Sequence, residues 1–243
     1  MASKTPSAPG STLLDPVCGR FTSSQKREAI AERFGISAPE SYSQRFNLAP
    51  TQRTLIVREQ QHERQAAFVH WGLLPHWAKD ERIAYKLINA RAETLAEKPA
   101  FRSLLAAHRC LVVADGFYEW RVAPDGERQP VHFRLADGRA FAFAGLWTAR
   151  ADDEGQLVES CTIVTTRPNE LVAAVHDRMP VILPRDVEDE WLDPGISREH
   201  ALSLLEPYPA DAMIAAPASP LANSIRNEGP ELLLPELRQS AAA

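Results

Sequence analysis

The sequence predicts the α+β fold class, as a single β-rich domain of mostly antiparallel, barrel-like sheet with flanking helices. The middle of the chain is a series of short apolar runs separated by turn residues, which is typical of antiparallel strands. The helical patterns are short and lie on either side of that series. With 243 residues, of which 44% are hydrophobic and 24% charged, the chain can bury one substantial core.

The first predicted element is a helix over residues 24–34. Ile30 and Phe34 lie four residues apart on one face, Ser23 or Ser24 can cap the start, and Gly35 ends the helix. Strands are expected next at residues 54–57 and 66–71, followed by a loop at 72–77. Two segments have helix-forming composition and are separated by Pro99, namely residues 92–98 and 100–108.

Central strands are expected where apolar runs are bounded by turns, at residues 110–114, 131–135, 140–147 and 160–166. A further sheet segment leaves Gly116, and its alternation places Glu119 on the same face as Phe117. The chain then predicts a short helix, a strand and two more helices, at residues 168–175, 181–183, 185–192 and 197–205.

The two ends are expected to lie outside the folded domain, which we place at residues 18–238. Residues 1–17 are dominated by Ser, Thr, Pro, Ala and Gly, so we expect a disordered extension that is removed or reflects a mis-assigned start. Residues 239–243 are expected to form a flexible tail.

Composition excludes several classes of protein. The net charge of −5 argues against coating nucleic acid by bulk electrostatics, but it allows a confined cleft with a few arginines. Three widely spaced cysteines predict reduced thiols, with neither a disulfide framework nor a metal site. No apolar run approaches the roughly 20 residues of a membrane helix, and residues 1–17 lack the apolar centre of a secretory signal. We therefore expect a cytoplasmic protein without a membrane partner or cofactor.

Four runs in a fixed order carry a family resemblance: Cys18–Phe21, Asn89–Thr94, Gly116–Trp120 and His176–Pro180. Together with residues 223–232, they resemble the SRAP family, the SOS-response-associated peptidase-like proteins. That family senses abasic sites in single-stranded DNA and bonds to them covalently through an N-terminal cysteine. The resemblance implies a DNA-repair protein that acts as a monomer, has single-stranded DNA with abasic sites as its partner, and associates with the nucleoid when bound.

The chemistry that the resemblance implies depends on a cysteine at a chain terminus. A ring-opened abasic site is an aldehyde, which condenses with a free α-amine to an imine. The thiol of the same residue can then close a five-membered thiazolidine, and this step is intramolecular. An amide nitrogen is not nucleophilic, so an internal Cys18 offers only a reversible hemithioacetal. The ordinary pKa values are roughly 7.7 to 8.0 for the amine and roughly 8.5 for the thiol, so we expect a modest perturbation to activate either.

The resemblance assigns roles to four catalytic residues. Cys18 is the nucleophile, and Asn89 orients the sugar or the amine. Glu119 serves as acid and base in forming and reversing the bond, while His176 helps to open the sugar ring. Each has a simpler alternative: core packing for Cys18, a turn for Asn89, a surface carboxylate for Glu119 and a helix cap for His176. Cys110 and Cys161 lie in apolar runs and are expected to be core residues.

For DNA binding, three arginines lie beside proposed catalytic residues and suit phosphates that flank the lesion: Arg20, Arg91 and Arg178. Apolar wedges against the base stack are expected from Trp77 and Trp120. The alternatives are ordinary ion pairs, such as Arg91 with Glu93 or Arg178 with Asp177, and core packing of the tryptophans.

The 17 residues before Cys18 leave three hypotheses for function. In the first, translation starts at codon 17: a GTG codon there reads as valine within a chain but as formyl-methionine at a start, and removal of that methionine exposes the amine of Cys18. Alternatively the protein is a cysteine autopeptidase, in which the thiol of Cys18 attacks the Val17 carbonyl and removes the leader. The third hypothesis is a noncovalent single-stranded DNA-binding module whose intact extension disables the chemistry.

Overall fold

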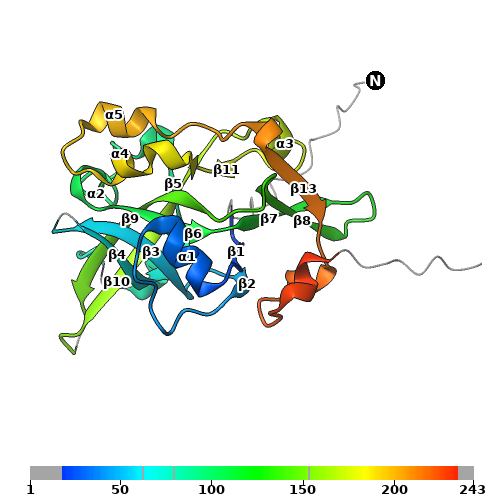
Figure 1. Cartoon of the computed structure of the whole chain (residues 1–243), viewed down its shortest axis with the longest axis horizontal. Coiled ribbons are helices and arrows are strands. Elements are labelled where there is room, and N and C mark those ends of the chain that lie inside the picture. Colours follow the sequence, from blue (N-terminus) through cyan, green and yellow to red (C-terminus); the bar gives the residue numbers. More distant parts are fainter. Residues whose placement is uncertain (1–17, 62, 79, 153, 235–243) are drawn as a thin grey trace, which may run out of the picture.

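The computed structural model describes residues 18–234, except 62, 79 and 153. It contains two sheets, with most of the helices against the larger one and α3 beside β13 of the smaller one (Figure 1). The predictions for residues 1–17 and for the tail at 239–243 fall outside the described residues. None of the helices in the described ranges is long and apolar enough to cross a bilayer.

The larger sheet contains a closed ring of five strands: β3 (Arg53–Gln60), β4 (Glu63–Trp71), β6 (Arg109–Ala114), β9 (Phe141–Ala151) and β10 (Leu157–Thr166). The strands pair in the order β10, β4, β3, β6, β9, and β9 pairs back onto β10. All these pairings are antiparallel except that of β10 with β4. The barrel-like, mostly antiparallel fold predicted from the sequence is therefore confirmed.

The smaller sheet has five antiparallel strands in the order β13 (Met213–Pro217), β8 (Arg128–Leu135), β7 (Gly116–Val122), β1 (Phe21–Ser23) and β2 (Arg45–Leu48). The first strand of the chain thus lies between β7 and β2, and Phe21 is opposite Phe117. This pairing brings the start of the described chain to a strand almost 100 residues away in sequence.

Two apolar cores explain why the barrel strands are almost continuously hydrophobic. Leu55 and Val57 of β3 belong to the core under α1 (Arg27–Phe34), α2 (Leu104–Ala107), α4 (Glu188–Leu192) and α5 (Arg198–Ser203). Ile56 between them faces the other way and belongs to the core that includes Phe21 and Phe117 of the smaller sheet. Helices cannot fit inside a five-stranded ring, so Ile56 lies on its inner face. Both faces are covered, and the period-2 pattern is therefore hidden.

Short elements complete the described chain: η1 (Glu81–Lys86), β5 (Asn89–Arg91), η2 (Ala92–Thr94), α3 (Glu170–Ala173), β11 (Met179–Pro180), β12 (Ile182–Leu183), η3 (Arg185–Val187), η4 (Ala210–Ala212), η5 (Pro220–Asn223) and η6 (Pro230–Leu233). The strands predicted at 110–114, 131–135, 140–147 and 160–166 are confirmed. Three of their eight ends coincide with the observed ends, four differ by one to three residues, and β9 ends four residues later than predicted. The helices predicted at 168–175, 185–192 and 197–205 are confirmed in shorter form.

Two predictions about helices are wrong. The first helix begins at Arg27, not at residue 24, and Lys26 precedes it without a side-chain cap. Ser24 is not a cap because its backbone N–H and hydroxyl both donate to the carboxylate of Asp115. Residues 92–108 form mainly turns, with only the short η2 and α2. Isolated turn hydrogen bonds, such as Lys98 to Thr94 and Leu105 to Phe101, hold the segment while Leu95, Phe101 and Leu105 are buried in the core.

Candidate functional site

Cys18 and Glu119 meet in the interior of the protein. The backbone N–H of Cys18 donates to Oε1 of Glu119 at 2.8 Å, and both residues are buried. The pairing of β1 with β7 explains the contact: Phe21 is opposite Phe117, and the N–H of Tyr118 donates to the carbonyl of Arg20. The antiparallel register therefore places Glu119 beside the residues that precede β1.

The thiol of Cys18 is held in its neutral form. Burial raises its pKa well above the ordinary value, and the negative charge of Glu119 raises it further. The sequence-based expectation is that the surroundings of the thiol activate it. The structure shows the opposite, because burial and the charge of Glu119 disfavour the thiolate. The backbone of Cys18 has φ of 46°, a left-handed conformation that costs a non-glycine residue about 1 kcal/mol or more.

A buried polar network aligns β1 with β7. Asp115, which lies between β6 and β7, accepts hydrogen bonds from the hydroxyl of Thr22 and from Ser24. Nε2 of His132 lies 3.2 Å from the Thr22 hydroxyl. Burial lowers the pKa of His132 to about 4, with a smaller effect from Arg134. The imidazole is thus neutral, and an Nε2–H donating to Thr22, which donates to Asp115, satisfies all three groups.

Glu119 opens onto a pocket of about 440 Å³, here called the glutamate pocket, which is lined by Gly19, Arg20, Pro50, Glu119, Trp120, Arg128 and Asn223. Arg20 is largely buried and donates to Oδ1 of Asn47 at 2.7 Å and to the carbonyl of Ala222 at 2.9 Å. The guanidinium carbons of Arg20 and Arg128 lie 5.5 and 5.4 Å from the ring centroid of Trp120. The pocket therefore combines a carboxylate with an aromatic ring between cations.

A second pocket, of about 730 Å³, is here called the histidine pocket and includes Trp77, Asn89, Arg91, His176 and Arg178. The barrel strand β10 brings these segments together. Ile163 of β10 pairs with Asn89 in parallel, and Thr165 pairs with Pro180, which follows the turn that carries His176. Lys86 and Lys98 add positive charge to the same walls.

The two arginines of the histidine pocket differ in their partners. Arg178 forms a two-pronged ion pair with Glu93, at 2.7 and 2.9 Å, and donates to the carbonyl of Thr165. This contact lowers the pKa of Glu93. The ion-pair alternative predicted Asp177 as the partner of Arg178 and Glu93 as that of Arg91, and the structure joins Arg178 to Glu93. Arg91 is exposed.

His176 is oriented by its own turn. The backbone N–H of Arg178 donates to Nδ1 of His176 at 3.0 Å, so the neutral ring carries its proton on Nε2. Oδ1 of Asp177 lies 3.1 Å from the same Nδ1, and this pair forms only when the ring is protonated. The imidazole can therefore present Nε2 to a ligand in the pocket.

Comparison with known proteins identifies the family. The model of the protein family described as "SOS response associated peptidase (SRAP)" matches residues 17–225. The chain belongs to the SRAP family. Over 221 residues it is 45% identical to the abasic site processing protein YoqW of Bacillus subtilis (strain 168), covering 89% of this chain and 99% of the relative.

Other SRAP proteins are more distant. This chain is 30% identical over 227 residues to the abasic site processing protein YedK of Escherichia coli (strain K12). The alignment covers 90% of this chain and all of that protein. Identity is 28% over 236 residues to HMCES of Rattus norvegicus, covering 81% of this chain and 66% of that protein. A crystal structure of a Bacteroides thetaiotaomicron protein superposes with a TM-score of 0.82 at 27% identity, covering 90% of this chain and all of that one.

The nine predicted SRAP site residues divide into two groups. Arg20, Glu119 and Trp120 line the glutamate pocket, and buried Cys18 joins them through its contact with Glu119. The histidine pocket is lined by Trp77, Asn89, Arg91, His176 and Arg178. Cys18 lies in the same buried cluster as Ile88 and Met179, which are close in sequence to Asn89 and His176. Trp77 is 50% exposed, so the core alternative is wrong for that residue.

Sequence reasoning missed several residues of these walls: Tyr85, Lys86, Lys98, Arg128 and Asn223. Tyr85, Lys86, Lys98 and Arg128 lie outside the runs that carry the family resemblance, and Asn223, which begins the run 223–232, was assigned no role. Cys110 and Cys161 are fully buried, and burial raises the pKa of both thiols, as expected of core cysteines. Within the described ranges, no three His, Cys, Asp or Glu side chains are grouped to hold a metal ion.

Proposed function

We propose that this SRAP protein processes abasic sites in single-stranded DNA by forming a thiazolidine crosslink through the amine and thiol of Cys18. The observation that carries the proposal is the 2.8 Å contact between the nitrogen of Cys18 and the carboxylate of Glu119, at the wall of a pocket. The relatives from Bacillus subtilis and Escherichia coli, matched over nearly their full length, are named abasic site processing proteins.

The reaction balances without an oxidant or metal. The α-amine of Cys18 adds to the aldehyde carbon, and loss of one water gives the imine. The sulfur then adds to the same carbon, while the thiol proton passes to the imine nitrogen. In this proposal Glu119 takes a proton from the amine and returns it to the departing hydroxyl, and the same transfers in reverse open the ring.

The raised pKa of the Cys18 thiol favours an order of steps. A neutral thiol is a poor first nucleophile, whereas an amine whose proton is accepted by Glu119 can add first. Once the imine has formed, sulfur and carbon belong to one residue, so a high effective concentration compensates for the low thiolate fraction.

The histidine pocket supplies the other roles in this proposal. Nε2 of His176 donates to the ring oxygen of the closed sugar, and Asn89 orients the aldehyde. Arg91, exposed at the pocket wall, contacts a flanking phosphate, while the Trp77 ring stacks on a base. Arg178 is held by Glu93 and shapes the pocket more than it binds phosphate.

The decisive experiment compares protein cut just before Cys18 with protein that keeps residues 1–17. Cut protein incubated with single-stranded DNA bearing one abasic site should give an adduct that survives denaturation, visible on a gel and as one water lost in the intact mass. DNA without the lesion should give none. The cut Cys18→Ala variant is the control for the nucleophile. Equal, heat-stable crosslinking by uncut protein of verified mass would exclude the α-amine mechanism.

A second candidate function, autopeptidase removal of the leader, is favoured by the backbone at Cys18. The left-handed φ of 46° strains the residue that follows the scissile bond, and Glu119 contacts the nitrogen that would leave. A freshly purified full-length chain should then lose residues 1–17 over time, and Cys18→Ala and Glu119→Gln should slow the loss. Identical masses for all three proteins after prolonged incubation would argue against this activity.

A further inference from the structure

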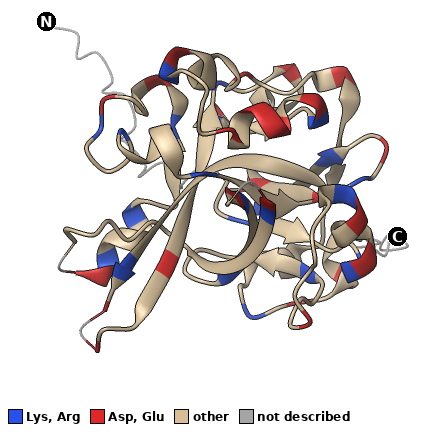
Figure 2. Cartoon of the chain, turned by 60° about the vertical axis from the view of Figure 1, so that its left-hand side comes forward, with Lys and Arg blue, Asp and Glu red and all other residues tan. Residues whose placement is uncertain are grey.

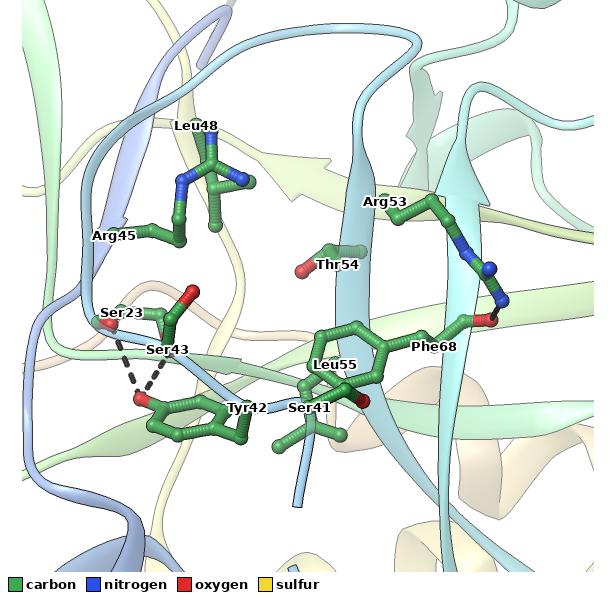
Figure 3. A pocket seen from close by; sticks show the side chains of 10 residues that line it. All are labelled: Ser23, Ser41, Tyr42, Ser43, Arg45, Leu48, Arg53, Thr54, Leu55 and Phe68. Carbon is green, nitrogen blue, oxygen red and sulfur yellow. Dashed lines mark hydrogen bonds between the residues drawn. The ribbon is translucent and has the colours of Figure 1, made fainter. Parts of the chain in front are cut away.

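A third pocket lies where the two sheets meet, and it shares no lining residue with the glutamate or histidine pocket. Its volume is about 300 Å³, at the lower end of the range for small-molecule sites. Figure 3 shows the side chains that line it: Ser23, Ser41, Tyr42, Ser43, Arg45, Leu48, Arg53, Thr54, Leu55 and Phe68. We call it the arginine pocket because Arg45 and Arg53 stand on opposite sides of it.

The Thr54 hydroxyl is the most informative feature of the arginine pocket. Thr54 is only 1% exposed, and its Oγ1 has no hydrogen-bond partner in the described part of the chain. In Figure 3 this oxygen points into the space between Arg45 and Arg53. A buried hydroxyl without a partner costs about 1–3 kcal/mol, so its orientation toward a cavity indicates a polar ligand there.

The two arginines are anchored but keep donors for a ligand. Arg45 donates through Nε to Glu228 at 3.0 Å and through Nη2 to Gln52 at 2.8 Å. Arg53 donates through Nη2 to the carbonyl of Phe68 at 2.7 Å. The Nη1 groups of both arginines make no hydrogen bond to any residue in the described ranges. Glu228 offsets one positive charge, and the pocket remains a site for an anion.

The rest of the lining is hydroxyl-rich on one side and apolar on the other. Ser41 and Ser43 are exposed at the rim, while the Tyr42 hydroxyl is already bound to Ser23 and Gln25. Leu48 and Leu55 are buried at separate places in the wall, and the half-buried ring of Phe68 provides a flat face.

We propose that the arginine pocket binds a phosphate monoester that carries a flat ring system, of the size of a nucleoside monophosphate. The two guanidinium groups and the hydroxyls of Ser41, Ser43 and Thr54 supply more donors than the two oxygens of a carboxylate can use. They match the three terminal oxygens of a phosphate. The base stacks on Phe68, and the Thr54 hydroxyl donates to the phosphate. The same group occurs in a free nucleotide and at the phosphorylated end of a DNA strand.

Calorimetric titration of the full chain with dAMP tests this site. We expect saturable binding with a Kd below about 1 mM, no binding of deoxyadenosine under the same conditions, and weaker binding of inorganic phosphate. To separate the two sources of the phosphate, a 5′-phosphorylated trinucleotide is compared with its unphosphorylated form on the Cys18→Ala variant, which cannot crosslink. Preference for the phosphorylated strand over dAMP identifies a strand end as the ligand; the reverse identifies a free nucleotide.

Three variants make the assignment specific. Arg53→Gln and Arg45→Gln should each weaken dAMP binding by about tenfold, since each removes a charged hydrogen bond. Thr54→Val keeps the shape of the side chain and should weaken binding several-fold while raising the melting temperature of the ligand-free protein, because it removes an unpaired buried hydroxyl. A purely structural Thr54 would not produce this opposite pair of effects. Arg139→Gln, an exposed arginine that does not line the arginine pocket, is the matched control.

The outcomes that overturn the proposal are distinct. Absence of saturable dAMP binding at concentrations up to about 10 mM would overturn it. Equal affinity for dAMP in wild type and Arg53→Gln would also overturn it. Binding that is lost in Glu119→Gln but kept in Arg53→Gln and Thr54→Val would place the nucleotide in the DNA site instead.

Discussion

At the scale of single residues, the site depends on one carboxylate beside one backbone nitrogen. Glu119 is buried, and the N–H of Cys18 donates to it. Its charge helps to keep the nearby thiol neutral, and in the proposed mechanism it also receives the amine proton. These two effects favour the same order of reaction, with nitrogen before sulfur.

Glu119→Gln should slow adduct formation by about 100-fold, because the amide can accept the hydrogen bond of the amine but cannot take its proton. Reversal should slow as well, since the same proton returns. Rates are measured by quenched crosslinking and by exchange of preformed adduct onto fresh abasic DNA. Glu127→Gln, an exposed glutamate in a turn, is the control. Unchanged rates in both directions would remove Glu119 from the mechanism.

His132 predicts a pH dependence of stability. Its pKa is about 4 in the folded protein and ordinarily 6.5, so below pH 6.5 the unfolded chain binds a proton that the folded chain does not. The contribution of neutral His132 to the free energy of unfolding is therefore fully present above pH 6.5. It declines as the pH falls toward 4 and is about 2 kcal/mol smaller at pH 5. The raised pKa of Asp115 acts in the opposite direction, because the folded state then binds the extra proton.

Denaturant unfolding at pH 7.5 and pH 5 measures this difference. His132→Gln should lose less stability between these pH values than wild type, although it is less stable at pH 7.5. The exposed His70→Gln variant is the control and should follow wild type. An equal loss in wild type and His132→Gln would show that another group causes the acid sensitivity.

At the scale of elements, the pairing of β1 with β7 determines where Cys18 lies. The network of Thr22, Asp115 and His132 holds this register, and Gly116 leaves the space that His132 occupies. A Cβ at Gly116 would lie 2.1 Å from Nε2 of His132.

Gly116→Ala should therefore destabilise the protein by about 1–3 kcal/mol and slow crosslinking, since His132 and β1 must move. Removing the obstruction in Gly116→Ala/His132→Ala should restore part of the crosslinking rate relative to Gly116→Ala alone. Thermal unfolding and single-turnover crosslinking measure the two effects. If Gly116→Ala is as stable and as active as wild type, the register is not set by this contact.

At the scale of the whole molecule, the net charge is consistent with the proposal that DNA binds through a few local contacts rather than through a broad basic face. The chain carries a net charge of −5, and acidic segments are visible on helices in the upper part of Figure 2. The first turn of α4 is acidic, with Asp189 and Glu190 exposed and Glu188 buried against Arg33. The basic side chains that remain useful for phosphate are those of the pocket walls, such as Arg91, Lys86 and Lys98.

Affinity for single-stranded DNA should fall with salt along a shallow slope that reflects a few phosphate contacts. Arg91→Ala should reduce the slope of log K against log salt by about 0.7, the value for one contact to a single strand. Arg178→Ala should reduce it less and should lower stability more, because Arg178 already pairs with Glu93. Binding is measured by fluorescence anisotropy on the Cys18→Ala background, with Arg139→Ala as control. A steep slope that neither variant changes would indicate a larger binding surface.

The sequence by itself determined the fold class, most central strands and the four runs that mark the SRAP family. Short-range patterns suffice for these, because apolar runs between turns specify strands locally and catalytic runs are contiguous. The N-cap of α1 and the helices expected at 92–108 could not be predicted in this way, since Asp115 and the apolar core compete with local preference there.

Only the tertiary structure decided which residues meet. It joined Cys18 to Glu119 across 101 positions, paired Arg178 with Glu93 across 85, and formed the arginine pocket from strands of both sheets. Such contacts depend on strand order and register, which arise from the burial of both barrel faces and from the network around Asp115. No spacing along the chain encodes them, because the sheet brings together residues whose separation in sequence is set by all the loops between them.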